Sequence, residues 1–352
     1  MKALRWHARK DIRVEEIAEP VSGPDQVKVK VKWCGICGSD IHEVEAGPLL
    51  IATSKPHPLP GSKTAPVVMG HEFVGDIVEI GRQVTGFNIG DRVAVRPTMP
   101  CFRCHWCKKG NHMQCSTMGA IGSIWDGGFA EYMVAPGHCI YKIPDHLSYE
   151  AAVFAEPLAC AVHAVKRANM SPGDSVAVVG AGPIGNLTMQ VAKVCGAGSV
   201  FVIDMLSKRR ELALELGATA VFNPYDVDAG KEIAKVTEGL RADIVFECAG
   251  PPAAMLTALN VGGKGGKIVE VGQMVGTCDF PFQRFWMHEK TIISAQAYTD
   301  EFPIALSFLS DKRIHVEPLI TSKIKLDDII EQGFKVLTGD QKNAHVKILV
   351  ST

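Results

Sequence analysis

Residues 2–32 alternate apolar and polar side chains along the chain. Val27, Val29 and Val31 occupy every second position, and each is followed by a lysine. A period of two is the pattern of a strand that buries one face, so this segment is predicted to form half-buried antiparallel strands. The amino-terminal part of the chain is therefore expected to be rich in antiparallel sheet.

From residue 175 onward the pattern changes to short apolar runs separated by helix-like segments. The predicted strands cover residues 175–179, 200–203, 242–248, 267–272 and, near the end, 345–350. The predicted helices cover residues 183–195, 303–310 and 326–337. Strands that alternate with helices form a parallel sheet with helices on both faces, so this part, as far as about residue 297, is predicted to be a doubly wound α/β domain.

Length and composition limit the class of protein. With 352 residues, 47% hydrophobic and 21% charged, the chain can bury two cores. A net charge of -1 leaves no basic excess for a phosphate backbone, so no nucleic-acid partner is expected. Without an apolar signal segment or a run of about 18 apolar residues, the protein is predicted to be cytoplasmic, with no membrane partner. Its 11 cysteines are then expected to be reduced core thiols or metal ligands.

An imidazole and a carboxylate, His71 and Glu72, lie side by side in an apolar segment that begins at Val67. Burying both groups requires compensating partners, and a metal ion is one such partner. The alternative is a half-buried strand whose histidine has an ordinary hydrogen-bond partner.

The stretch from Trp33 to His42 contains two thiols, a hydroxyl, a carboxylate and an imidazole. Cys34 and Cys37 have the Cys-x-x-Cys spacing of redox-active and zinc-binding pairs. The simpler alternative is a pair of core thiols.

Four further cysteines follow the spacing C-x-x-C-x-x-C-x7-C: Cys101, Cys104, Cys107 and Cys115. Four thiolates in one loop suit a closed tetrahedral zinc site. An iron–sulfur cluster or four unlinked thiols are the alternatives. Only scattered basic residues surround them, which argues against a nucleic-acid zinc ribbon.

A glycine motif, G-x-G-x-x-G, begins at Gly180 and directly follows the predicted strand 175–179. It opens a predicted helix at Pro183, and in this context backbone amides can approach a pyrophosphate at the helix N-terminus. The motif in this position predicts a dinucleotide site.

The choice of dinucleotide depends on Asp204, which follows the predicted strand 200–203. A carboxylate there accepts hydrogen bonds from the adenosine ribose hydroxyls and repels a 2′-phosphate, so NAD is predicted in preference to NADP. The basic cluster at 208–210 is what an NADP enzyme would use. Met205, rather than a basic residue, follows the carboxylate directly, so Asp204 is given more weight.

The spacing G-H-E-x-x-G-x5-G-x-x-V from Gly70 to Val84 becomes specific when it is combined with G-I-C-G-S-D at 35–40 and G-D-R-V at 90–93. Together these motifs resemble the zinc signature of the medium-chain, zinc-dependent alcohol and polyol dehydrogenases.

The resemblance implies an α/β protein with a GroES-like, β-rich catalytic domain and a Rossmann domain with a doubly wound parallel sheet. Residues 1–157 and 298–352 would form the GroES-like domain, with a structural zinc lobe at about 97–118. Residues 158–297 would form the NAD-binding domain. Members of the family usually form homodimers or homotetramers.

The resemblance also implies two zinc sites. Cys37, His71 and Glu156 would hold a catalytic zinc, with Glu72 as an additional or alternating ligand. The position of Glu156 is cysteine in the alcohol dehydrogenases and glutamate in the polyol and butanediol types. The alternative for Glu156 is a charge favoured by the dipole of the helix that it begins. The four cysteines of the 101–115 loop would hold a structural zinc.

Further roles come from the resemblance. With Glu72, the predicted catalytic set contains Ser39 and His42, which would relay a proton, and Asp40, which would orient His71. Zinc would lower the pKa of the substrate alcohol, and hydride would pass from its carbon to the nicotinamide. The alternatives are that Ser39 caps a turn and that His42 is merely exposed. The expected cofactor contacts are Gly180, Gly182, Pro183, Ile184, Gly185, Asp204, Arg209, Val271, Gly272, Gln273, Ala295, Gln296 and Ala297. Of these, the resemblance places residues 271–273 and 295–297 along the nicotinamide.

Within the family, the loop 47–67 and the segment 331–350 look most like the (R,R)-butanediol dehydrogenases. Sorbitol dehydrogenases share the glutamate but have a tyrosine and an arginine where this chain has Glu43 and Ala297. The predicted substrate is a small secondary alcohol or vicinal diol, such as 2,3-butanediol, or the matching ketone, such as acetoin. The alternatives are a polyol or L-threonine dehydrogenase and a noncatalytic NAD(P)-binding relative, like the crystallins or quinone reductases.

Overall fold

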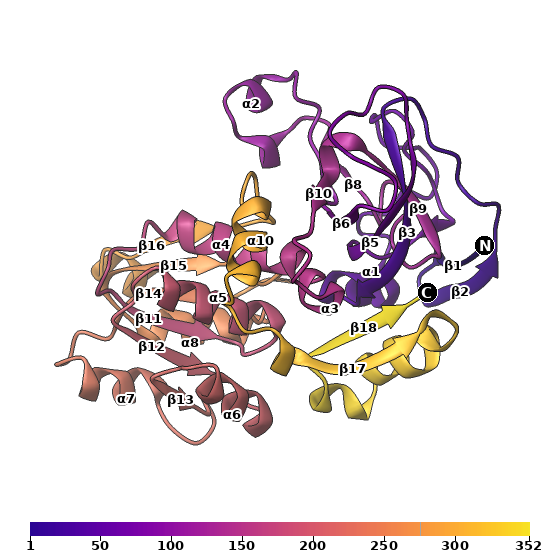
Figure 1. Ribbon diagram of the computed structural model, residues 1–352. Helices are drawn as coiled ribbons and strands as arrows, with labels where there is room; N and C mark the ends of the chain where they lie inside the picture. Colours follow the sequence, from indigo (N-terminus) through magenta and orange to yellow (C-terminus); the bar gives the residue numbers. More distant parts are fainter. Residues whose placement is uncertain (275) are drawn as a thin grey trace. The chain divides into compact units, whose positions relative to one another are not determined.

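The computed structural model describes residues 1–274 and 276–352, which fall into two compact units. Unit 1 comprises Met1–Glu156, Ala305–Asp311 and Leu319–Thr352, and unit 2 comprises Pro157–Ile304 and Lys312–Pro318. The chain can be followed through both units by colour in Figure 1. Over the described residues, no helix has the length and apolar character needed to cross a membrane.

Unit 1 is built mainly from strands. Its strands are β1 (Lys2–Ala8), β2 (Asp11–Glu16), β3 (Gln26–Gly35), β4 (Val67–Val68), β5 (Glu72–Ile80), β6 (Arg92–Val95), β7 (Thr98–Met99), β8 (Gly119–Ala120), β9 (Tyr132–Pro136), β10 (Ile140–Lys142), β17 (Ile320–Lys325) and β18 (Lys347–Ser351). Its helices are α1 (Gly38–Ala46), α2 (His105–Lys108), α3 (Tyr149–Ala152) and α11 (Lys335–Thr338). Two helices continue across the unit boundaries, α4 (Ala155–Ala168) and α10 (Phe302–Ser310).

The main sheet of unit 1 has the strand order β10-β6-β5-β3-β18-β17, with β9 paired to β3. The predicted alternation along β3 is confirmed for the apolar face, because Val27, Val29 and Val31 are buried, and Lys30 is exposed. Lys28 departs from it, because its side chain is buried and paired with Glu19. These valines belong to a continuous core that also contains Trp6 and side chains from β5, β6 and β18. Burial of this core fixes the register of β3 against β5 and β18.

The helix predicted over 326–337 has a different form. A 3-10 turn at Leu326–Asp328 leads into a π-helical segment, Ile329–Phe334, and then into α11. Within this segment, Gly333 packs against the core, since a β-carbon there would lie 2.7 Å from Ile36 Cδ1. The apolar spacing therefore predicted a helical segment correctly but not its wider turn.

Unit 2 is a doubly wound α/β unit. Its strands are β11 (Ser175–Val179), β12 (Ser199–Ile203), β13 (Ala220–Phe222), β14 (Ala242–Glu247), β15 (Gly262–Glu270) and β16 (Thr291–Ser294). Its remaining helices are α5 (Pro183–Val194), α6 (Ser207–Glu215), α7 (Ala229–Val236), α8 (Pro252–Val261) and α9 (Phe282–Met287). The strands are all parallel, in the order β13-β12-β11-β14-β15-β16. This order places a ligand crevice at the carboxyl ends of β11 and β14, where the winding reverses.

Candidate active site

The backbone pairing of unit 1 explains why Cys37 and His71 meet. Gly35, at the end of β3, pairs with Glu72, at the start of β5. Cys37 follows just before α1, and His71 directly precedes β5. The metal-binding atoms of Cys37, His71 and Glu72 consequently lie within 4.8 Å of one another. A thiolate, an imidazole and a carboxylate are the donor types that zinc uses in catalytic sites.

Two neighbours of Cys37 contact the His71 ring. Asp40, which is buried, has Oδ1 3.3 Å from His71 Nδ1, and its Oδ2 accepts a hydrogen bond from the Cys37 amide at 2.9 Å. Ser39 Oγ lies 3.4 Å from His71 Nε2. Burial lowers the pKa of His71, but the negative charges of Asp40 and Cys37 outweigh it and hold that pKa well above its ordinary value. The negative charges around His71 therefore favour a cation at this site, either a proton or a metal ion.

A buried lysine that the motifs do not include completes this cluster. Lys347 on β18 donates to both carboxylate oxygens of Glu72, at 2.8 and 2.7 Å, and to the carbonyl oxygen of Ile36 at 3.1 Å. The exposed fractions of the Lys347 and Glu72 side chains are 2% and 0%. Burial lowers the pKa of Lys347, but the charges of Glu72 and Cys37 outweigh it, so the pKa is raised and the lysine is charged.

Three other residues that the sequence pointed to, Glu156, His42 and Cys34, lie outside the cluster of Cys37, His71 and Glu72. Glu156, the second residue of α4, is buried and is not among the atoms that meet within 4.8 Å. Its charge nevertheless contributes to the raised pKa of Lys347. His42 lies on α1 and is half-buried. Cys34 is a core thiol whose pKa is raised by burial, so the Cys-x-x-Cys pair contains one ligand candidate, Cys37.

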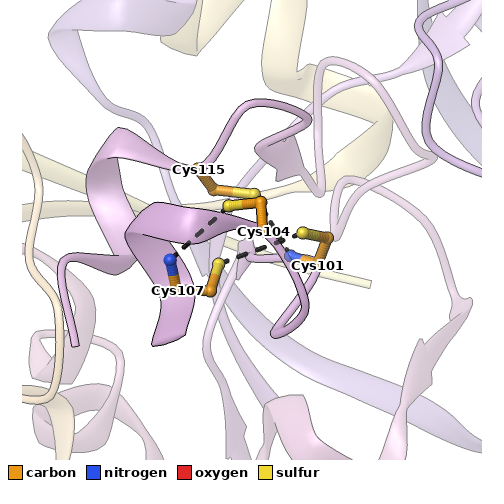
Figure 2. Close-up of side chains that lie close together, drawn as sticks. All are labelled: Cys101, Cys104, Cys107 and Cys115. Atoms are coloured by element: carbon orange, nitrogen blue, oxygen red, sulfur yellow. Dashed lines mark hydrogen bonds between the residues drawn. The ribbon is translucent and has the colours of Figure 1, made fainter. Parts of the chain in front are cut away.

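The four cysteines of the 101–115 loop converge around one point (Figure 2). Their sulfur atoms all lie within 4.8 Å of one another, and Cys101 Sγ is 4.0 Å from Cys107 Sγ. A tetrahedral zinc with Zn–S bonds of about 2.3 Å would place its sulfurs about 3.8 Å apart. Backbone amides donate to two of the sulfurs, from Cys107 to Cys104 at 3.5 Å and from Cys101 to Cys115 at 3.3 Å. The loop thus fits a structural zinc ion.

The same contacts predict the order in which these thiols react. Amides of Cys107 and Ser116 lower the pKa of Cys104 to about 5, whereas burial raises the pKa of Cys107 to about 12. After zinc is chelated, iodoacetamide at neutral pH is expected to label Cys104 much faster than Cys107, because only the thiolate reacts. Peptide mass spectrometry measures the order. Cys195, an exposed thiol whose pKa is raised by burial of its sulfur, is the control, and faster labelling of Cys195 than Cys104 would contradict the prediction.

The glycine motif lies between β11 and α5, as predicted. Gly180 has φ +96°, and a β-carbon at Gly185 would lie 1.8 Å from its carbonyl oxygen, so both positions require glycine. Gly182 is the N-cap of α5, with Pro183 and Ile184 as the first two helical residues. Because Gly182 has no side chain to cap α5, the first backbone amides of this helix are suited to bind a phosphate.

Asp204, at the carboxyl end of β12, is tied to this loop. Its Oδ2 accepts from the Ala181 amide at 2.7 Å, and its Oδ1 accepts from the Leu206 amide at 2.8 Å. Arg209 Nη1 lies 4.0 Å from the Asp204 carboxylate, and Arg210 donates to its carbonyl oxygen at 2.8 Å. The basic side chains at 209 and 210 thus both contact Asp204.

The two later cofactor segments follow neighbouring strands. Amides of Val271 and Gly272 donate to the carbonyl oxygen of Glu247 at 2.8 Å, which holds the turn after β15 against the end of β14. The amide of Ala295 donates to the carbonyl oxygen of Glu270 at 2.9 Å, directly after β16. Residues 271–273 and 295–297 therefore both lie at the carboxyl edge of the parallel sheet, where this class of fold binds ligands.

Two buried charged residues, Lys347 and Glu301, were not identified from the sequence. Lys347 is the first residue of the apolar strand β18 and lies between Val346 and Ile348, and a cation at the start of a buried strand is a signal that could have been followed. Glu301, discussed below, directly precedes the apolar helix α10, and nothing in its neighbourhood distinguishes it from an ordinary residue at the start of a helix.

The folds and sites of the two units define a metal-binding, dinucleotide-binding dehydrogenase. Comparison with known proteins agrees. Residues 23–145 match the family "Alcohol dehydrogenase GroES-like domain", and residues 183–311 match "Zinc-binding dehydrogenase". The chain therefore belongs to the zinc-binding alcohol dehydrogenase family and is an oxidoreductase. This confirms the predicted resemblance and the predicted pairing of a GroES-like with a Rossmann domain.

Individual relatives match over the full length. The chain is 40% identical to (R,R)-butanediol dehydrogenase of Bacillus subtilis, over 99% of both chains. It is 34% identical to a sorbitol dehydrogenase of Halalkalibacterium halodurans, over 100% of this chain and 99% of the relative. The crystal structure of the Bacillus subtilis 2R,3R-butanediol dehydrogenase superposes with a TM-score of 0.92 at 39% identity, covering 100% of this chain and 99% of the other.

Proposed function

We propose that this chain catalyses the reversible oxidation of a small vicinal diol, of the 2,3-butanediol type, by NAD. The observation that carries the proposal is the cluster of Cys37, His71 and Glu72 in a chain with a glutamate at position 156. The full-length match to a butanediol dehydrogenase supports the same substrate class.

The mechanism follows from what each side chain can do. Zinc held by Cys37, His71 and Glu156 would lower the pKa of the substrate hydroxyl. Asp40 engages Nδ1 of His71, which leaves Nε2 for the metal. Ser39 Oγ, 3.4 Å from that Nε2, is placed to take up the substrate proton, and His42 on the same helix passes it outward.

Glu72 has a more restricted part in this scheme. Both of its oxygens already accept hydrogen bonds from Lys347. A Glu72 contact with zinc would therefore have to share or replace these bonds. We assign Glu72 as an additional ligand that exchanges between Lys347 and the metal.

Position 43, one of the two positions that differ from sorbitol dehydrogenases, supports a small substrate. The carboxylate of Glu43 accepts from the amides of Leu49 and Leu50, each at 2.9 Å, and is 4% exposed. It fixes the loop after α1 and is not available to bind a polyol hydroxyl. A long polyol chain would lack that contact.

Initial rates of NADH formation with the three 2,3-butanediol stereoisomers, sorbitol, L-threonine and ethanol test the proposal. We expect the largest kcat/KM with a butanediol isomer. The largest value with sorbitol or threonine would favour one of the two alternative dehydrogenases. Absence of NADH formation with every substrate, from protein that carries zinc, would favour a noncatalytic relative.

The preference for NAD is assigned to Asp204. Removing its carboxylate in Asp204→Gly removes the repulsion of a 2′-phosphate, so the ratio of kcat/KM for NAD over NADP is expected to fall at least about tenfold. Steady-state kinetics with both cofactors measure this ratio. An unchanged preference for NAD in the variant would show that another group selects the cofactor.

We infer that the chain forms a homodimer or homotetramer. Strand β16 lies at one edge of the sheet and carries no charged side chain, and Ile292 on it is exposed. On α9, which precedes β16, Phe282, Trp286 and Met287 are more than half exposed. An uncharged edge strand beside an apolar patch suits antiparallel pairing with a second copy about a two-fold axis.

Light scattering tests the assembly, with Ile292→Lys expected to shift the protein toward monomers. A monomeric wild-type protein would contradict the proposed assembly.

The cytoplasm is the compartment that we propose, because its reducing conditions keep the thiolate ligands of both sites available.

A further inference from the structure

Glu301 is a buried carboxylate in unit 2 that contacts two separate parts of this unit. Its Oε2 accepts from the backbone amides of Thr299 and Asp300, at 2.6 and 2.9 Å. Its Oε1 lies 3.0 Å from Lys166 Nζ and 3.2 Å from His163 Nδ1, both on α4. The exposed fraction of Glu301 is 1%. One side chain thereby links α4 to the segment that follows β16.

The carboxylate is ionised in the folded protein. Burial raises the pKa of Glu301, but the contact with His163 and the hydrogen bonds from Lys166 and the Thr299 amide outweigh it and lower that pKa to about 2. Hydrogen bonds to a charged acceptor are shorter and stronger than those between neutral groups. The charge therefore strengthens both halves of the link.

The linked segment is the one assigned to the nicotinamide. Residues 295–297 follow β16 at the carboxyl edge of the sheet, and Ala297 has φ +44°, a left-handed conformation that is unfavourable for alanine. Such a conformation persists where the surroundings enforce it. Downstream of Ala297, Tyr298 is fully buried and Glu301 holds the next two amides.

The other end of the segment is held by the same helix. Arg167 Nε on α4 donates to the carbonyl oxygen of Ser294 at 3.2 Å. Three successive contacts of α4, through His163, Lys166 and Arg167, thus bracket residues 295–300. Of these contacts, the one from Arg167 is a hydrogen bond to a neutral backbone carbonyl. The contacts from His163 and Lys166 depend on the negative charge of Glu301.

We propose that Glu301 is a positioning residue, which uses its charge to hold residues 295–297 in the shape that receives the nicotinamide ring. This rests on the proposed function, because the nicotinamide role of this segment is part of it. Glu301 acts through the Thr299 and Asp300 amides and touches neither substrate nor cofactor.

Comparing two ligands in the Glu301→Gln variant separates this role from a general loss of structure. NADH carries the nicotinamide, whereas ADP-ribose contains only the part that the glycine loop and Asp204 would bind. We expect the Kd for NADH to rise about tenfold, because a charged acceptor becomes neutral, with the Kd for ADP-ribose unchanged. Hydrogen exchange at Thr299 and Asp300 should quicken in the same variant.

Two further variants complete the test. Lys166→Gln removes an exposed cation and leaves the carboxylate in place, and we expect a rise of about threefold in the NADH Kd. Glu215→Gln, an exposed carboxylate on α6, is the control and should change neither Kd.

The outcomes separate this proposal from the function on which it rests. Equal weakening of both ligands by Glu301→Gln, or no change in either Kd, would overturn the positioning role. If Glu301→Gln does not fold, an unchanged NADH Kd in Lys166→Gln would overturn it. Wild-type protein that binds neither ligand would instead contradict the proposed function.

Discussion

Replacing Cys37 with serine is expected to lower kcat/KM for a butanediol at least about a thousandfold. A Lewis-acid metal contributes several kcal/mol to the stabilisation of developing charge, and each 1.4 kcal/mol is about a factor of ten in rate. The hydroxyl of serine is a poor zinc ligand at neutral pH compared with a thiolate. Zinc content should fall from two ions to one per chain, because the 101–115 loop keeps its four thiols. Metal analysis and steady-state kinetics on the same preparation measure both effects.

Cys34→Ala is the matched control for this variant. Cys34 lies three positions before Cys37 but is a buried core thiol. Its removal should cost stability through a small cavity and leave zinc content and kinetics close to wild type. If Cys37→Ser kept both zinc ions and its full activity, Cys37 would not be a ligand of the catalytic metal.

Replacing Lys347 with methionine is expected to lower the free energy of unfolding by about 3–5 kcal/mol, because it leaves the Glu72 carboxylate buried without a cation. Both carboxylate oxygens lose their donors in this variant, and the side chain is fully buried. Denaturant unfolding of the zinc-free protein measures the change, because a zinc ion at Cys37 and His71 would supply Glu72 with another cation. The double variant with Glu72→Gln should recover much of the loss, since no unpaired charge remains.

Lys335→Met is the control for the loss of an ordinary ion pair. The Lys335 and Glu331 side chains are paired at 2.6 Å but are 64% and 67% exposed, so their separation should cost less than about 1 kcal/mol. Equal stability of Lys347→Met and Lys335→Met would contradict a tightly paired, buried Glu72.

Features encoded over short stretches could be predicted from the sequence. The alternation of Val27, Val29 and Val31 determines which face of β3 is buried, and this was confirmed. The four cysteines of the 101–115 loop lie within one turn-rich segment, so their spacing alone brings their sulfurs together. The glycine motif is similar, because the strand and the helix that flank it are adjacent in the chain.

Features that depend on distant pairing could not be predicted. Lys347 reaches Glu72 only because β3 pairs with β5 on one side and with β18 on the other. No local pattern reveals that a lysine and a glutamate 275 positions apart share one buried site.

The central claim is that this chain moves hydride directly from the carbinol carbon of a small diol to NAD. Its most direct test uses the 2,3-butanediol stereoisomer with the largest kcat/KM, with deuterium on the carbinol carbons, followed by NMR of the NADH that forms. Direct transfer predicts one deuterium on nicotinamide C4 in every NADH, with none lost to water. Unlabelled NADH from the labelled diol, or no NADH at all from protein that carries both zinc ions, would contradict the account.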